Sequence, residues 1–415
     1  MKLKQSCQDF KSLLRFDQVP YEFREPFIHT GYRVPNCSLK TCVKSIFHFN
    51  NNETINFWTH FIPFLFLLNE TIKLCLNFHY CNFFLPLFLY LSTTCFYLLM
   101  SSVAHALNCM SPIARHVCFI LDYLCISIYG MACAIAYKAY IIKVIDIQAN
   151  SFDKYVFLAM LICSISNTMS CASRFVVSIH KRGLLRITPF ILQYVFISLP
   201  LIYKFTQTYK PESVDNLDVV LSFLSSNNSN QTSNQYNKRI EVHDDLDVMN
   251  KLDLLNYNGT LSYFKGVFVQ FFDFKSESDF YYFLHIGAAI IACCLYCFHI
   301  PERLFPGRFD ILGSSHQIFH IFAFTCSYAQ FIGLKIDMRK LLIKKTLDQE
   351  SSNPREDFLE TSDVTLMMFC CLVLNIIIFI YYYLKAVYNN PWQKKAKTHM
   401  LNSSNKCDLN HEKTN

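Results

Sequence analysis

The feature that most constrains this chain of 415 residues is a series of long apolar blocks that carry almost no charge. Each block is about 20 residues long, which is the length of helix needed to cross the ~30 Å hydrocarbon core of a bilayer. The composition agrees, because 52% of the residues are hydrophobic and only 17% are charged, whereas soluble domains carry about a quarter charged residues. The sequence therefore predicts an all-α integral membrane protein.

The apolar blocks predict a seven-helix bundle followed by an eighth C-terminal transmembrane helix. The expected spans are residues 57–77, 83–107, 116–142, 155–178, 187–205, 280–300, 316–335 and 365–388. The first is the least regular, because Glu70 and Lys73 interrupt it. The remaining segments are expected to be an N-terminal region at 1–56, a transmembrane core at 57–336, a loop at 337–364 and a tail at 389–415.

Positive charge in the short connections predicts the orientation of the spans. Lysine and arginine gather in the N-terminal 56 residues, in the connection between the fourth and fifth spans, and in the tail. Cytoplasmic loops are enriched in these residues, so we expect the N-terminus and the tail in the cytoplasm. The basic residues of the connection 335–364 fall on the opposite side and count against the placement of the last span.

The long polar segment 206–279 is then expected on the extracellular side. It carries three Asn-x-Ser/Thr sequons, which are acceptors for N-glycans on exposed loops, at Asn227, Asn230 and Asn258. Chance is the alternative, because an asparagine-rich segment forms sequons freely. The sequons at Asn36 and Asn52 lie on the predicted inside and should carry no glycan.

Charge and cysteine usage exclude two other classes of protein. The net charge of +7 is modest and spread over loops and tails, which favours membrane anchoring and argues against a nucleic-acid partner. Most of the 19 cysteines lie inside apolar blocks, so they are expected to pack against helices or lipid and not to form a disulfide framework.

Five polar residues inside the apolar blocks form the candidate site. Ser101 and His105 lie four residues apart near the end of the second span, and His316 and His320 have the same spacing at the start of the seventh. Residues four apart share one face of a helix, so each pair can point at one place. Asp122 lies early in the third span. Because successive spans alternate in direction, all five residues should lie at the same depth, near the cytoplasmic ends of the helices.

Three imidazoles with an open fourth position are typical of a catalytic zinc site, where the metal lowers the pKa of bound water to about 7. We therefore predict zinc as the cofactor, with His105, His316 and His320 as ligands. Asp122 would orient an imidazole or accept a proton from the water, and Ser101 would hydrogen-bond the water or a polarised carbonyl.

Three alternatives to this site stay open at this stage. The histidine pair could simply lie at the membrane interface, zinc could be a structural staple, or His116 could replace His105 as a ligand at the same depth. We interpret the other histidines near span ends as interfacial, namely His60, His79, His116, His180, His285 and His299.

Several blocks of sequence resemble the progestin and adipoQ receptor family. They are EPFIHTGYR from Glu25, NETINFWTH from Asn52, SSVAHALNC from Ser101, LDY from Leu121, and PERLFPGRFDILGSSHQIFH from Pro301. The resemblance places that family's zinc ligands on the three histidines named above and its serine and aspartate on Ser101 and Asp122. Met110 and Ser314 depart from the family pattern, at positions that are not metal ligands.

The resemblance also implies a function. The short N-terminal region and the extra segment 365–388 are most similar to the membrane progestin receptors, which implies a plasma-membrane steroid receptor that signals, with G proteins as candidate partners. The alternative is a zinc-dependent intramembrane lipid amide hydrolase of the ceramidase type. The identity of the steroid or lipid cannot be predicted, because apolar and aromatic residues suited to such a pocket occur throughout the chain.

Overall fold

A computed structural model describes residues 13–77, 83–142, 154–176, 178–208, 274, 276–348 and 361–388. These residues form helices and contain no β-strand, apart from one isolated bridge between Leu14 and Tyr32. The all-α class is therefore confirmed. The longer helices are α2 Thr54–Asn77, α3 Leu85–Leu107, α4 Pro112–Ala136, α5 Tyr155–Ser173, α6 Ile179–Ile197, α7 Leu199–Thr208, α11 Glu277–Phe298, α12 Ser315–Asp348 and α13 Thr361–Tyr388.

Helices lie at every position where a span was expected. Within the described residues, six helices are long and apolar enough to cross a membrane, and the pair α6 and α7, bent by 41°, forms a seventh candidate. Helix α12 is outside this set, and polar or charged residues recur along it, from His316 and His320 to Lys335 and Asp337. Helix α2 continues through Glu70, whose buried carboxylate forms an ion pair with Lys73, with 2.9 Å between Oε1 and Nζ.

Helix α12 continues beyond the predicted end of its span, through part of the segment 337–364 that was expected to be a loop. The reason lies in its apolar residues. Leu334, Met338 and Leu341 follow one another at helical spacing and are all buried, so they extend the face that packs on the bundle. The charged residues between them had suggested a connection outside the membrane.

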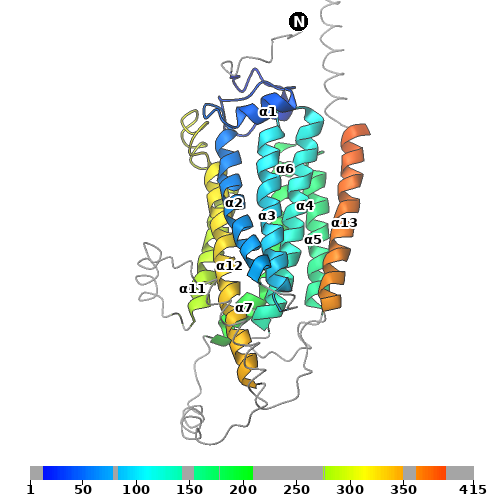
Figure 1. The fold of residues 1–415 in the computed structure, drawn as a ribbon. Helices are drawn as coiled ribbons and strands as arrows, with labels where there is room; N and C mark the ends of the chain where they lie inside the picture. The colour runs from blue at the N-terminus through cyan, green and yellow to red at the C-terminus, as the bar shows by residue number, and fades with distance from the viewer. Residues whose placement is uncertain are drawn as a thin grey trace, which may run out of the picture.

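The helices run side by side in a bundle whose two ends differ (Figure 1). The short helix α1, Leu39–Ser45, lies across the end where α3 finishes and where α4 and α12 begin. Helix α7 lies at the opposite end. The end covered by α1 is therefore the one that brings together the end of α3 and the starts of α4 and α12, as the candidate site requires.

Helix α13 packs against α4 and α5 at the edge of the bundle (Figure 1). Its fully buried Asn375 accepts a hydrogen bond of 2.8 Å from the Asn167 amide of α5 and donates to the Cys371 carbonyl at 2.8 Å. In an apolar environment a polar pair of this kind fixes the contact between two helices. The C-terminal helix is thus joined to the bundle by a specific bond as well as by apolar packing.

Candidate metal centre

Three histidines from two helices meet at the end of the bundle covered by α1. One nitrogen from each of His105, His316 and His320 lies within 4.8 Å of the others, and these are the only residues of the described part of the chain grouped in this way. The Nε2 atoms of His105 and His316 are 3.3 Å apart. His105 and His320 are buried, while His316 is partly accessible.

The separation of one pair of these nitrogens equals that of two ligands on a zinc ion. Two ligands at about 2.0–2.1 Å from zinc in tetrahedral geometry lie about 3.3 Å apart, which is the separation of the His105 and His316 nitrogens. The chemistry of the donors fits as well, because imidazole nitrogens are common zinc ligands and three of them leave one position open. The residues present therefore suit a zinc ion held between α3 and α12.

His105 is oriented by a carboxylate from the start of α2. Its Nδ1 lies 2.7 Å from Glu53 Oε2, so the ring donates from Nδ1 and its Nε2 lone pair points into the cluster. The amides of Asn108 and Asn56 also donate to this carboxylate, at 2.5 and 3.1 Å. A carboxylate behind a ligand histidine fixes the tautomer and raises the basicity of the ring, which is a regular feature of metal sites.

Glu53 is kept ionised by its surroundings. Burial opposes the charge, but the hydrogen bond from His105 and the positive charge of Arg33 outweigh burial and hold the pKa of the carboxyl well below its usual range. The Arg33 guanidinium also binds the end of α3, donating to the carbonyl oxygens of His105 at 2.6 Å and Ala106 at 2.9 Å. The last carbonyls of a helix lack partners within it, so this arginine caps α3 and fixes the backbone of His105.

His320 is held by the next turns of α2. Its Nδ1 lies 3.0 Å from Thr59 Oγ1 and 3.2 Å from the carbonyl oxygen of Asn56. A carbonyl only accepts, so Nδ1 carries the proton and Nε2 is left with a lone pair for a metal. The ring of His60 stacks on that of His320 at 3.8 Å between centroids. Two of the three ligands therefore have a defined tautomer.

The start of α12 is fixed by the loop that precedes it. Glu302 accepts from the backbone N–H of Ser315 at 2.7 Å, which places a negative charge at the N-terminus of the helix. Gln317 accepts from the N–H of Gly313 at 2.6 Å and donates to the carbonyl of Ile311 at 2.8 Å. Gly313 has φ +81°, a conformation that a side chain disfavours. These contacts set the direction in which His316 and His320 enter the bundle.

The other two predicted site residues, Ser101 and Asp122, lie near the three histidines but are not part of their group. Ser101 is buried on α3, one helical turn before His105. Asp122 is half-buried on α4, outside the group of three ligands but within electrostatic range of His105 and Arg186. Within the described residues its carboxyl makes no hydrogen bond or ion pair. The group includes His105 and not His116, whose ring stacks on Phe175 at 5.7 Å between centroids.

Comparison with known proteins places this chain in a family of membrane proteins. The profile of haemolysin-III-related proteins matches residues 48–226 and 259–331. Membrane progestin receptor gamma of Mus musculus is 30% identical over 374 residues, which cover 89% of this chain and 92% of that protein. The chain belongs to the haemolysin-III-related family. Membrane progestin receptor delta of Mus musculus is 31% identical over a region that covers 79% of both chains. Membrane progestin receptor alpha of Homo sapiens is 26% identical over a region that covers 77% of this chain and 75% of that protein.

Family membership agrees with the motif-based resemblance to the progestin and adipoQ receptors, which is confirmed. The residues around the three histidines were not predicted. Glu53, Asn56 and Thr59 contact them and lie in the block NETINFWTH that carried part of the resemblance. His60, which was expected near a membrane interface, is 3% exposed inside the bundle. The spacing of Glu53, Asn56 and His60 along one helix face was the signal available.

His285, which was also expected near a membrane interface, has its side chain buried inside the bundle. Its Nδ1 lies 3.0 Å from the carbonyl oxygen of Cys326, and its Nε2 lies 3.1 Å from the hydroxyl of Tyr194. It therefore belongs to a polar network inside the bundle. His79 and the side chain of His180 lie outside the described residues, as do the three predicted glycosylation sites.

Proposed function

We propose that this chain is a multi-pass plasma-membrane receptor for a steroid of the progestin class, with zinc bound by His105, His316 and His320. The observation that carries the receptor proposal is the similarity to membrane progestin receptor gamma, which extends over 89% of the chain and 92% of that protein. The proposed topology has a cytoplasmic N-terminus, so the zinc site lies at the cytoplasmic ends of α3 and α12.

Zinc in this position would link α3 and α12, which are far apart in the sequence. Helix α3 is fixed at this end by Arg33 and Glu53, and α12 by Glu302. A steroid that enters the bundle from the lipid and displaces either helix would move the loops attached to this end. Such movement could be transmitted to a cytoplasmic partner, for which a G protein is our candidate.

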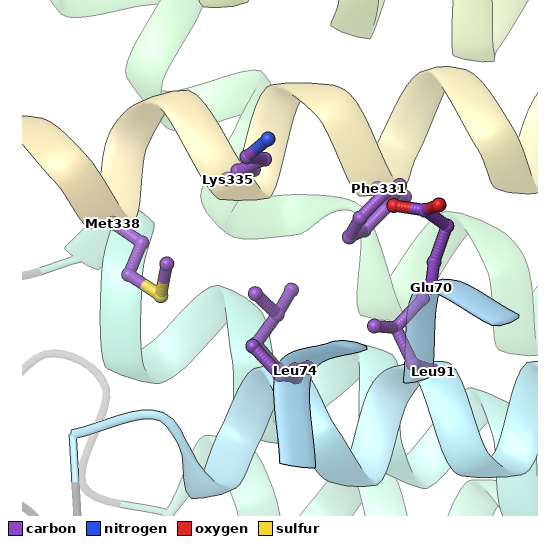
Figure 2. Close-up of a pocket in the computed structure, with 7 residues that line it drawn as sticks. Glu70, Leu74, Leu91, Phe331, Lys335 and Met338 are labelled. Carbon is purple, nitrogen blue, oxygen red and sulfur yellow. The ribbon is translucent and has the colours of Figure 1, made fainter. Parts of the chain in front are cut away.

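A cavity lies between α2, α3 and α12 farther along the bundle, and Figure 2 shows Glu70, Leu74, Leu91, Phe331, Lys335 and Met338 around it. Its empty volume of about 250 Å³ includes space open to solvent. Its lining is mostly apolar, as is usual for a site that takes a small apolar ligand.

Steroid binding is tested directly with a labelled progestin and the purified full chain in lipid. Saturable binding that unlabelled progestin displaces is the expected result. The chain loaded with an unrelated amphiphile of similar size provides the specificity control. Labelling that rises linearly with concentration and cannot be displaced would contradict the receptor proposal.

A second candidate function is a zinc-dependent hydrolase acting on a lipid amide such as ceramide. The observation that favours it is the carboxyl of Asp122, which is half-buried and near His105 but is not one of the three grouped ligands. Bound zinc would supply a water of lowered pKa. Asp122 would accept a proton, and the Ser101 hydroxyl, one turn from His105, would donate to the carbonyl of the lipid.

The two functions are separated by measuring both on one preparation. If Asp122 is a general base, Asp122→Asn should retain zinc and fold but release fatty acid from ceramide about 100-fold more slowly, or slower still. We expect saturable steroid binding with weak or no turnover. Turnover without steroid binding would replace the receptor proposal by the hydrolase.

A further inference from the structure

A cluster of three cysteines lies beneath the N-terminal segment, outside the metal centre. Cys37, Cys42 and Cys109 are all buried and pack against one another, and the sulfur atoms of Cys42 and Cys109 are 3.6 Å apart. Cys42 belongs to α1, and Cys109 follows the end of α3. The two thiols are 67 residues apart in sequence, so their approach is a product of the fold.

The backbone on both sides of the thiol pair is held in place. Ser38 caps α1 by accepting from the N–H of Thr41 at 3.2 Å. The N–H of Asn36 donates to the carbonyl of Cys109 at 2.9 Å, and Arg33 donates to the Asn108 side chain at 2.6 Å. A disulfide has an S–S length of about 2.03–2.05 Å, so the two sulfur atoms, now 3.6 Å apart, must move closer together for the bond to form.

The surroundings favour one of the two sulfurs as the nucleophile. Hydrogen bonding with the Cys37 and Cys42 side chains, together with the nearby charge of Arg33, lowers the pKa of the Cys109 thiol. The same pairing, with burial, raises the pKa of Cys42. The thiolate is the reactive form of cysteine, so Cys109 is the sulfur more ready to attack an oxidant.

We propose that Cys42 and Cys109 form an oxidisable pair, which a hydroperoxide converts into a disulfide that fastens α1 to the end of α3. The Cys109 thiolate attacks one oxygen of hydrogen peroxide, the O–O bond breaks, and the departing hydroxide takes a proton to become water. Cys109 is then a sulfenic acid. The Cys42 sulfur attacks it, the S–O bond breaks, and the hydroxide released leaves as water with the Cys42 proton. Two thiols are oxidised and one peroxide is reduced to two waters.

The location gives the reaction a consequence. On the proposed topology the pair faces the cytoplasm, where thiols are kept reduced, so the disulfide would form only under oxidation and would be reversible. It would join the N-terminal segment to the residues directly after α3, one helical turn beyond His105. The alternative is that the three cysteines only fill space, in which case oxidation would not link them selectively.

The test treats the purified full chain in lipid nanodiscs with increasing hydrogen peroxide, alkylates the remaining thiols and maps linked peptides by mass spectrometry. We expect a Cys42–Cys109 peptide that appears at lower peroxide than oxidation of the exposed Cys75 and disappears after treatment with dithiothreitol. Oxidation of Cys75 without any Cys42–Cys109 link would overturn the proposal. A link between Cys37 and Cys109 in its place would do the same.

Two variants assign the roles. Cys42→Ser should abolish the link and leave Cys109 as a sulfenic acid that dimedone labels, while Cys37→Ser, a matched change in the same cluster, should still form the link. If Cys42→Ser gave no dimedone adduct on Cys109, the assignment of the nucleophile would be wrong. The result with the unmodified chain stands even if one variant folds poorly.

Discussion

Replacing Glu53 by glutamine tests the arrangement around the metal ligands. Three donors converge on this carboxylate, namely His105 Nδ1 at 2.7 Å, Asn108 Nδ2 at 2.5 Å and Asn56 Nδ2 at 3.1 Å. A glutamine offers one oxygen and one NH₂ group, so in either orientation an N–H faces another N–H donor. One hydrogen bond is lost if the NH₂ group takes the place of Oε1 and two if it takes the place of Oε2, and the negative charge behind His105 is lost in both cases.

The expected magnitude follows from the role of such a carboxylate. Removing the partner of a ligand histidine weakens metal binding about 10–100-fold, which corresponds to roughly 1.4–2.8 kcal/mol. The assay is a competition titration of zinc between the purified protein and a coloured chelator, with helix content followed by circular dichroism. We expect Glu53→Gln to lose affinity within this range while remaining helical.

A matched control is available on the same helix. Glu70 is also a buried glutamate of the α2 region, but its carboxylate pairs with Lys73 and lines the cavity of Figure 2 instead of the histidine cluster. Glu70→Gln should therefore bind zinc as the unmodified chain does. Equal zinc affinity in Glu53→Gln and the unmodified chain, with helix content retained, would refute the assigned role of Glu53.

Three further predictions concern stability and topology. The pKa of Glu53 is lower in the folded chain than in the unfolded one, so its contribution to stability is present above about pH 4.3 and is lost as the pH falls toward the folded pKa. The thermal unfolding temperatures of the metal-free unmodified chain and of Glu53→Gln should therefore differ less at about pH 3 than at pH 7. Asn375→Leu removes the bond to Asn167 and should destabilise α13 by about 0.6–2 kcal/mol, measured by denaturant unfolding in detergent; no change would mean that apolar packing alone holds α13. Glycosidase treatment should shift the mass of the unmodified chain, but not that of a chain in which Asn227, Asn230 and Asn258, the three sequons predicted to be extracellular, are changed to glutamine. A glycan remaining on Asn36 or Asn52 would contradict the proposed topology.

Much of the fold follows from hydrophobicity alone, because the bilayer requires helices of a defined length. The positions of the spans and the joint depth of His105 and His316 came from that constraint and from the alternation of direction. Helix α12 shows where it fails, since the apolar residues Met338 and Leu341 continue its buried face among charged residues that resembled a loop. The end of this helix depends on packing against the bundle, so it could not be predicted from hydropathy.

The cluster of three histidines could be predicted because His105, His316 and His320 lie inside apolar blocks at regular spacing and at matching helix ends. The residues that orient them could not, since asparagine, threonine and glutamate at the start of a helix are equally typical of caps. Glu53 acquires its role through contact with His105, 52 residues away, and the approach of α2 to α3 determines that contact. The same holds for the thiols of Cys42 and Cys109, which are 67 residues apart and meet only because α1 lies against the end of α3.

The zinc content of the purified full chain tests the central claim most directly. Elemental analysis of the unmodified protein and of the double variant His316→Ala, His320→Ala, both purified without added metal or chelator, should give about one zinc per chain for the first and little for the second, because removal of two ligands abolishes tight binding. Equal zinc content in the two proteins would contradict the assignment of this cluster as the metal centre.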